Sequence, residues 1–158
     1  MPALFPIDAG ITQMRGVLKI IKDGGGTIGI AELADEAEEE IDDLFPILDA
    51  CKLLGLAKVN GGKVTITELG SGLTIKNMQK VLAPPLSEVE PFKTIILALK
   101  LEGEITTERL ANLLKENNLA FYSDKHKYME QLRRLLVKWA VRLRLLVYDQ
   151  ADDSWKLA

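Results

Sequence analysis

One stretch, residues 124–149, constrains the fold more than any other because its periodicity changes partway along. Its first part places apolar residues at helical spacing, where they form one wide stripe along a predicted helix. These residues are Tyr128, Leu132, Leu135, Trp139 and Leu143. Residues 145–148 are then rich in strand-forming side chains. The stretch therefore predicts a long helix that leads into a β-strand, with Trp139 turned toward the core.

Basic residues follow the same predicted helix about a quarter-turn from the apolar stripe. They are Lys127, Arg134, Lys138 and Arg142, which we call the basic stripe. At ~100° per residue, the first three lie within about 40° of one another around the helix. We expect these side chains to face solvent and to bind a partner.

In the second half of the chain, the sequence also predicts two shorter helices before the long helix and a hairpin after it. Apolar spacing indicates a helix over residues 92–99 and another around residues 110–114, with Thr106 or Thr107 as the cap of the second. A final strand is expected at residues 155–157. The predicted order is helix, helix, long helix and hairpin.

The first half shows the same order. A helix over residues 11–22 ends at the glycines of residues 24–26, and a second begins near Ile30. The sequence Asn60-Gly61-Gly62 separates two β-prone segments and predicts a hairpin, because Asn and Gly tolerate positive φ. A third helix lies between the second helix and this hairpin. Its buried side is expected to carry Ile41, Leu44, Phe45, Leu48 and Cys51.

Together these elements predict a mainly α protein with small β-hairpins (α+β). Three helices followed by a hairpin are typical of a winged-helix domain, so we expect two such units in tandem. Pro84-Pro85 marks the expected boundary, which gives a first unit of residues 1–83 and a second of residues 84–158. Pro2 and Pro6 make the first residues a poor helix, so we expect an extended or mobile lead-in there.

Acidic residues dominate the first unit. Residues 32–51 contain nine acidic side chains and no basic one. We call the acidic surface the five that surround the start of the third helix: Glu38, Glu39, Glu40, Asp42 and Asp43. These carboxylates would meet DNA phosphates directly, so the first unit is not expected to bind DNA in the usual pose. Two interpretations stay open, a solvated acidic face and a docking surface for a basic partner.

Charge and hydropathy place the chain in a broad class. The net charge of −3 excludes a uniformly basic nucleic-acid binder, although residues 86–158 hold 12 basic against 11 acidic residues and leave room for a local basic surface. No apolar run approaches the ~20 residues that span a bilayer, so no membrane insertion is expected. The first ten residues lack the pattern of a secretory signal. We therefore expect a cytoplasmic protein.

The sequence shows no catalytic, cofactor or metal site. Cys51 is the only cysteine and shares a helix face with leucines, which indicates a buried side chain. His126 is the only histidine and has no second ligand or nucleophile beside it. Residues 24–26 are not followed by the Lys-Ser/Thr of a phosphate loop. We expect a protein that is not an enzyme and holds no cofactor.

Two motifs point to a known family. The first motif is an acidic pair, an apolar pair and a proline, followed later by Leu-Gly, a hairpin and Thr-x-x-Gly. In this chain it is formed by Asp42, Asp43, Leu44, Phe45, Pro46, Leu54, Gly55, Thr67 and Gly70. The second is a tryptophan followed nine residues later by Tyr-Asp, formed by Trp139, Tyr148 and Asp149. Over about residues 10–150 the chain resembles the C-terminal AAA-associated domain, a module that follows the ATPase of ABC transporters in the nitrate/taurine class.

The chain also departs from the family. Ala140, Val141 and Arg142 stand where the family usually has Gly-Arg-Tyr, and no segment resembles a Walker A loop, a Ser-Gly-Gly signature or a Walker B strand. The resemblance therefore implies a stand-alone, non-enzymatic interaction or regulatory module, whose protein partner is an ABC-type ATPase subunit. The alternative is a winged-helix DNA-binding transcriptional regulator that uses the second unit, and the overall acidity counts against it. The sequence leaves a homodimer open.

We predict that the purified protein neither binds nor hydrolyses ATP, because no loop in its sequence is suited to cradle phosphates. Isothermal titration calorimetry with Mg-ATP should show no binding heat. Stoichiometric binding in the micromolar range would contradict this prediction.

Overall fold

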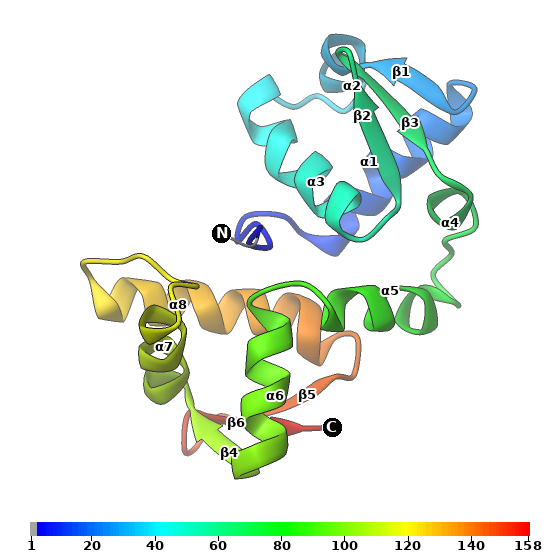
Figure 1. The fold of residues 1–158 in the computed structure, drawn as a ribbon. Helices are drawn as coiled ribbons and strands as arrows, with labels where there is room; N and C mark the ends of the chain where they lie inside the picture. Colours follow the sequence, from blue (N-terminus) through cyan, green and yellow to red (C-terminus); the bar gives the residue numbers. More distant parts are fainter. Residues whose placement is uncertain (1–2) are drawn as a thin grey trace. The chain divides into compact units, whose positions relative to one another are not determined.

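The computed structural model describes residues 3–158, which form a mixed α and β structure (Figure 1). The described part of the chain contains eight α-helices, one π-helical turn and two three-stranded antiparallel sheets. The chain divides into two units. The first comprises residues 8–81, and the second comprises residues 82–158 together with residues 3–7. The predicted mixture of helices and small hairpins is confirmed.

The first unit begins with a helix, a short strand and two further helices. These are α1 (Ile11–Asp23), β1 (Thr27–Gly29), α2 (Ile30–Glu36) and α3 (Ile41–Leu53). The helix predicted over residues 11–22 is confirmed, and its Met14, Val17, Leu18 and Ile21 are buried. The hairpin of β2 (Ala57–Asn60) and β3 (Lys63–Ile66) follows, then α4 (Glu68–Ser71).

The hairpin of the first unit turns at the predicted place. Asn60 pairs with Lys63, and the two residues between them, Gly61 and Gly62, have φ values of 57° and 79°. A two-residue turn of this kind requires positive φ at both positions, which glycine adopts without strain. The strand β1 then pairs with β3, so the sheet order is β1-β3-β2.

The third helix of the first unit is only partly as predicted. Leu44, Leu48 and Cys51 are buried, but Ile41 and Phe45 are each 44% exposed. Ile47 completes the buried stripe with i, i+3, i+4, i+7 spacing from Leu44, and Phe45 lies one residue off this stripe. Ile41 is the first residue of α3, next to its cap, Glu40. Two apolar side chains that we expected in the core therefore lie at the surface.

The second unit repeats the element order of the first. It contains α6 (Phe92–Glu102), β4 (Glu104–Thr106), α7 (Thr107–Glu116), α8 (Lys125–Leu135), the π-helical turn η1 (Leu136–Val141), β5 (Leu146–Asp149) and β6 (Ser154–Leu157). The sheet order is β4-β6-β5, the counterpart of β1-β3-β2. We did not predict β4, because three residues are too few to show a periodicity.

The predicted long helix is not regular along its whole length. It ends as an α-helix at Leu135 and continues as the π-helical turn, which contains Trp139. A π-helical turn holds more residues than an α-helical one, so the 3.6-residue arithmetic does not extend beyond Leu135. The apolar stripe is buried all the same, and Trp139 is 0% exposed, as predicted.

Residues 3–7 pack within the second unit. The Phe5 N–H donates to the Glu90 carbonyl at 2.8 Å, and the Phe5 ring meets Trp139 and Phe92 edge-on at centroid distances of 4.7 and 5.4 Å. Phe5 is 2% exposed. We expected this segment to be a lead-in to the first unit, and the part that the structure describes instead contributes to the second core. Pro2, on which that expectation partly rested, lies outside the described residues.

The expected boundary at Pro84-Pro85 lies inside a helix. Both prolines belong to α5 (Met78–Ser87), in the last half of its length. The division between the two units falls in the same helix, between Val81 and Leu82. The change of unit therefore takes place along α5.

We predict that Phe5→Ala lowers the free energy of unfolding by ~3–5 kcal/mol, because it leaves a cavity between Trp139 and Phe92. Leu4→Ala is the matched control, since Leu4 is 37% exposed, and it should cost less than half as much. Urea unfolding followed by tryptophan fluorescence measures both. Equal effects would mean that Phe5 is not a core residue in solution.

Candidate functional site

The basic stripe is exposed throughout. Lys127 and Arg134 lie on α8, Lys138 lies in the π-helical turn, and Arg142 follows directly after it. None of the four takes part in an ion pair within residues 3–158. The arginine of this region that does pair is Arg133, which the sequence analysis did not single out. The stripe is therefore available for an external partner.

The acidic surface is exposed except for Glu39, which is half-buried. Glu38 has a φ of 56°, so the chain turns there between α2 and α3. The exposed side chains of Ile41 and Phe45 lie on the helix that carries Asp42 and Asp43. Glu36, Glu38 and Glu39 also line a pocket of about 250 Å³, together with the apolar residues Val17, Ile20 and Ile47. Carboxylates and apolar surface are thus combined on this face.

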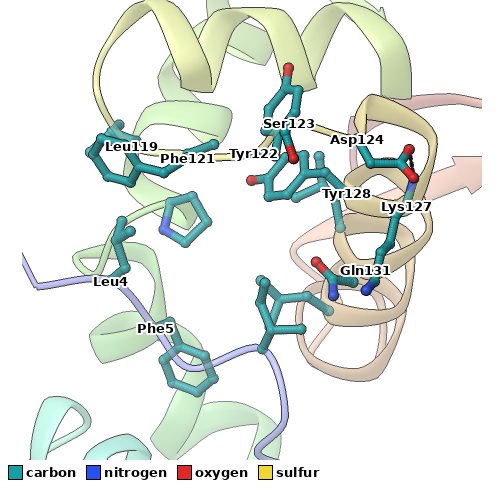
Figure 2. Close-up of a pocket in the computed structure, with 15 residues that line it drawn as sticks. Leu4, Phe5, Leu119, Phe121, Tyr122, Ser123, Asp124, Lys127, Tyr128 and Gln131 are labelled. Carbon is teal, nitrogen blue, oxygen red and sulfur yellow. Dashed lines mark hydrogen bonds between the residues drawn. The ribbon is translucent and has the colours of Figure 1, made fainter.

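A larger pocket, of about 430 Å³, lies within the second unit (Figure 2). Residues 4–7, the segment 119–124 and α8 form its walls. Most of its lining is apolar, with Phe5, Leu119 and Leu132 among the contributors. Its polar groups come mainly from the start of α8. They are Asp124, Lys127, Tyr128 and Gln131.

Two tyrosines form one wall of this pocket. The rings of Tyr122 and Tyr128 stack at a centroid distance of 4.5 Å with 9° between their planes. Lys115 places its ammonium 4.6 Å from the centre of the Tyr122 ring, and the Tyr122 hydroxyl donates to the Ala111 carbonyl at 3.1 Å. Burial raises the pKa of Tyr128 to about 12, and Tyr122 adds to this shift. The Tyr128 hydroxyl therefore stays protonated at neutral pH.

A polar network centred on Asp153 joins the helices to the hairpin of the second unit. Arg133 donates from Nε and Nη2 to the two Asp153 carboxylate oxygens, both at 2.9 Å. The Thr107 hydroxyl donates to Asp153 Oδ1 at 2.6 Å, and the Tyr148 hydroxyl donates to the same atom at 2.7 Å. The hydrogen bonds from Arg133 lower the pKa of Asp153 to about 2, and those from the two hydroxyls act in the same direction.

This Asp153 network continues into the core. The indole N–H of Trp155 donates to Thr107 Oγ1 at 2.8 Å, and both residues are 0% exposed. Thr107 therefore accepts from Trp155 while it donates to Asp153, so its buried hydroxyl has both a donor and an acceptor as partners. Nothing in the sequence pattern indicated this network, because Arg133 and Asp153 are 20 residues apart and lie in different elements.

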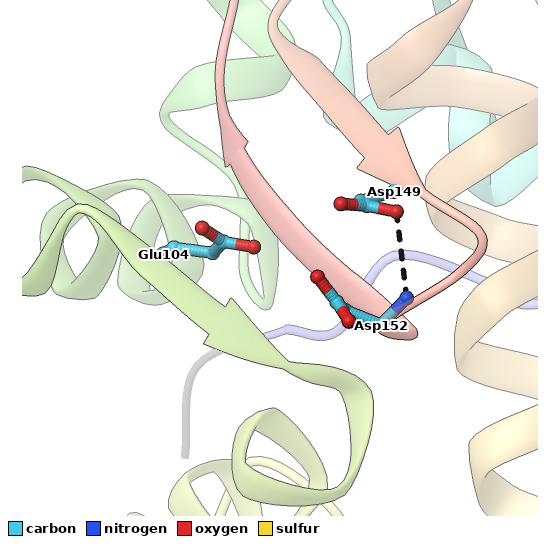
Figure 3. Close-up of side chains that lie close together, drawn as sticks. All are labelled: Glu104, Asp149 and Asp152. Carbon is cyan, nitrogen blue, oxygen red and sulfur yellow. Dashed lines mark hydrogen bonds between the residues drawn. The ribbon is translucent and has the colours of Figure 1, made fainter.

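Three carboxylates, from β4, the end of β5 and the turn after it, come together across the second sheet (Figure 3). One oxygen each of Glu104, Asp149 and Asp152 lies within 4.8 Å of the others. Glu104 accepts from the Ser154 hydroxyl at 2.5 Å, and Asp149 accepts from the backbone N–H of Ala151 at 3.0 Å. Two of the three carboxylates thus already accept hydrogen bonds, Glu104 from a side chain of β6 and Asp149 from the backbone of the turn after β5. Their proximity alone does not define a metal site.

The only cysteine is buried and the only histidine is exposed. Cys51 is 0% exposed, and burial raises the pKa of its thiol to about 12, so the sulfur is protonated and unreactive at neutral pH. The predicted burial of Cys51 is confirmed. His126 is exposed at the start of α8.

The fold and these sites describe an α+β protein of two similarly ordered units with charged surfaces and a mostly apolar pocket in the second unit. A family model, that of the C-terminal AAA-associated domain, matches residues 31–149, and the chain belongs to this family. The match begins in α2 and ends at Asp149, four residues before Asp153. No curated protein and no solved structure matches the chain. Across the described residues, no helix is long and apolar enough to cross a membrane.

We predict that Asp153→Asn lowers the free energy of unfolding at pH 7 by ~1–2 kcal/mol, an effect limited by the 34% exposure of the carboxylate. Asparagine tolerates the φ of 49° at this position, so the change removes the charge and one of the two acceptors of Arg133 without straining the backbone. Because the folded-state pKa lies below the ordinary 3.8, the contribution of Asp153 is present above about pH 4 and is lost as the pH falls toward 2.

Urea unfolding between pH 7 and pH 2.5 measures this effect. The difference between the parent and Asp153→Asn should shrink below about pH 4. Asp152→Asn changes an exposed neighbouring carboxylate and serves as the control. A loss of stability that is the same at all pH values would show that the charge on Asp153 is not its cause.

Proposed function

We propose that this chain is a non-enzymatic interaction module that docks onto an ABC-type ATPase subunit in the cytoplasm. Membership of the C-terminal AAA-associated domain family carries this proposal, because the description of the family ties it to ATPases. The module contributes no nucleotide chemistry of its own. It acts by binding, and any ATP hydrolysis belongs to the partner.

Both charged surfaces suit such docking. The acidic surface adjoins Ile41 and Phe45, and exposed apolar side chains rimmed by charge are typical of protein interaction sites. The basic stripe offers four exposed cations on one continuous segment. Charge on each surface would select partners and steer their approach, and the apolar side chains would supply affinity.

The alternative function is DNA binding by the second unit. In both units the helix–strand–helix–helix–hairpin order agrees with a winged-helix fold, and we propose that each unit is one. In such a domain the third helix enters the major groove, which would bring Lys127 and Arg134 near phosphates. The net charge of −3 opposes this function. We favour the protein partner.

The triple variant Lys127→Glu, Arg134→Glu, Lys138→Glu separates the two functions. It should fold normally, because all three side chains are exposed. Biolayer interferometry at ~150 mM salt, where distant charges are already screened, should show binding of the parent to a purified ATPase subunit of a nitrate/taurine-class transporter. The triple variant should bind at least ~10-fold more weakly.

The control is the triple variant Lys76→Glu, Lys80→Glu, Lys100→Glu, which makes the same change in charge at exposed positions outside the stripe. It should retain binding to the ATPase subunit. A gel-shift assay with a 30-base-pair duplex, whose length is about three helical turns, tests the alternative. Tight and salt-sensitive DNA binding by the parent, lost in the stripe variant but not in the control, would replace the ATPase with DNA as the partner.

A further inference from the structure

The pocket of the second unit has the features of a small-molecule site. Its volume of about 430 Å³ falls in the usual range for ligand pockets. Such sites combine a mostly apolar lining with a few polar groups that converge on the ligand. Here the apolar lining comes from residues 4–7, the segment 119–124 and α8, and the polar groups come mainly from α8 and the residues just before it.

The Tyr128 hydroxyl is the polar atom of the pocket that the fold leaves available to a ligand. Tyr128 is only 9% exposed, yet its hydroxyl forms no hydrogen bond within residues 3–158. Every fully buried side-chain polar atom in that part of the chain has a partner, so this hydroxyl must remain accessible. Tyr128 lines the pocket beside Tyr122, and the pocket is therefore where the hydroxyl can be reached (Figure 2).

The shape of the lining favours a ligand with a flat aromatic ring system. The stacked rings of Tyr122 and Tyr128 form one wall, and Phe5 forms part of another. Phe121 borders the pocket and is 63% exposed, which is unusual for an aromatic side chain of this size. Aromatic rings pack well edge-on or offset against such walls. A ring system that enters the pocket would cover Phe121.

The free donor groups of the pocket favour an anion. Lys127 lines it, is exposed and makes no ion pair with any described residue. Asp124 is the one acidic residue of the lining, and its Oδ1 accepts from the backbone N–H of Lys127 at 3.1 Å (Figure 2). As the cap of α8, this carboxylate is held at the positive end of the helix dipole. Lys127, Tyr128 and Gln131 remain as donors.

We propose that this pocket binds a small aromatic carboxylate or related organic anion. The ring system lies against Tyr128, Phe5 and Phe121. The carboxylate accepts hydrogen bonds from the Tyr128 hydroxyl and the Gln131 amide and interacts with the Lys127 ammonium. This site differs from the docking surfaces proposed above, although Lys127 belongs to both, and it is tested on the purified protein with no partner present.

The test compares naphthalene-1-acetate with its neutral counterpart, 2-(1-naphthyl)ethanol. Titrations of the full chain are followed by two-dimensional NMR of backbone amides. Both compounds should shift the signals of residues 119–124 and the start of α8, and the acid should bind ~3–5-fold more tightly than the alcohol. Lys127→Gln should reduce this preference to less than ~2-fold. Tyr128→Phe keeps the ring and should weaken binding of the acid by ~5–10-fold.

Lys100→Gln is the matched control, since Lys100 is exposed, lies outside the basic stripe and does not line the pocket. It should leave both affinities unchanged. Equal affinities of the parent for the acid and the alcohol, or tighter binding of 2-(1-naphthyl)ethylamine, would overturn the assignment of an anion. The absence of shifts around the pocket would overturn the site itself and would favour a partner's apolar side chain as its occupant. The ATPase-docking proposal is unaffected by either result.

Discussion

The second unit depends on the bidentate contact between Arg133 and Asp153. Through it, α8 is connected to the turn between β5 and β6, and the hydroxyl groups of Thr107 and Tyr148 bring α7 and β5 to the same carboxylate. The indole N–H of Trp155 depends on the same contacts, because it donates to the Thr107 hydroxyl, and that hydroxyl in turn donates to Asp153. A half-satisfied network of this kind would leave buried donors without acceptors, which costs more than each bond contributes.

The aromatic contacts of Phe5 have a second consequence, because they place residues 4–7 along the pocket. Phe5 fills the space between Trp139 and Phe92, and its neighbours Leu4 and Ile7 then line the opening beside α8. A packing interaction thus creates the one pocket of the second unit to which we assign a ligand. The same helix presents Lys127 at the rim of that pocket and carries Arg134 farther along. Core, pocket and charged surface are all organised by α8.

Much of the local structure could be predicted. Thr106, one of the two residues expected to cap α7, does so with a hydroxyl that accepts a backbone N–H group at 3.2 Å. The exposure of the basic stripe was predicted from helical spacing, and it persists although the π-helical turn changes that spacing. The exposure of Ile41 and Phe45 was missed, because an apolar side chain next to a helix start does not reveal whether another element will cover it.

The sequence by itself determined most of the helices, the two hairpins, the order in which they follow one another, the turn at Gly61 and Gly62 and the distribution of charge, because these depend on periodicity, backbone preference and composition within a few residues. Tertiary structure alone decided the contacts between distant segments. Phe5 reaches Trp139 and Arg133 reaches Asp153 only after the chain has folded back on itself. Tyr128 has a buried ring and an accessible hydroxyl for the same reason, since its pocket is walled by residues 4–7 together with the distant segment 119–124 and α8. Such contacts depend on distances in space, which local sequence patterns do not encode.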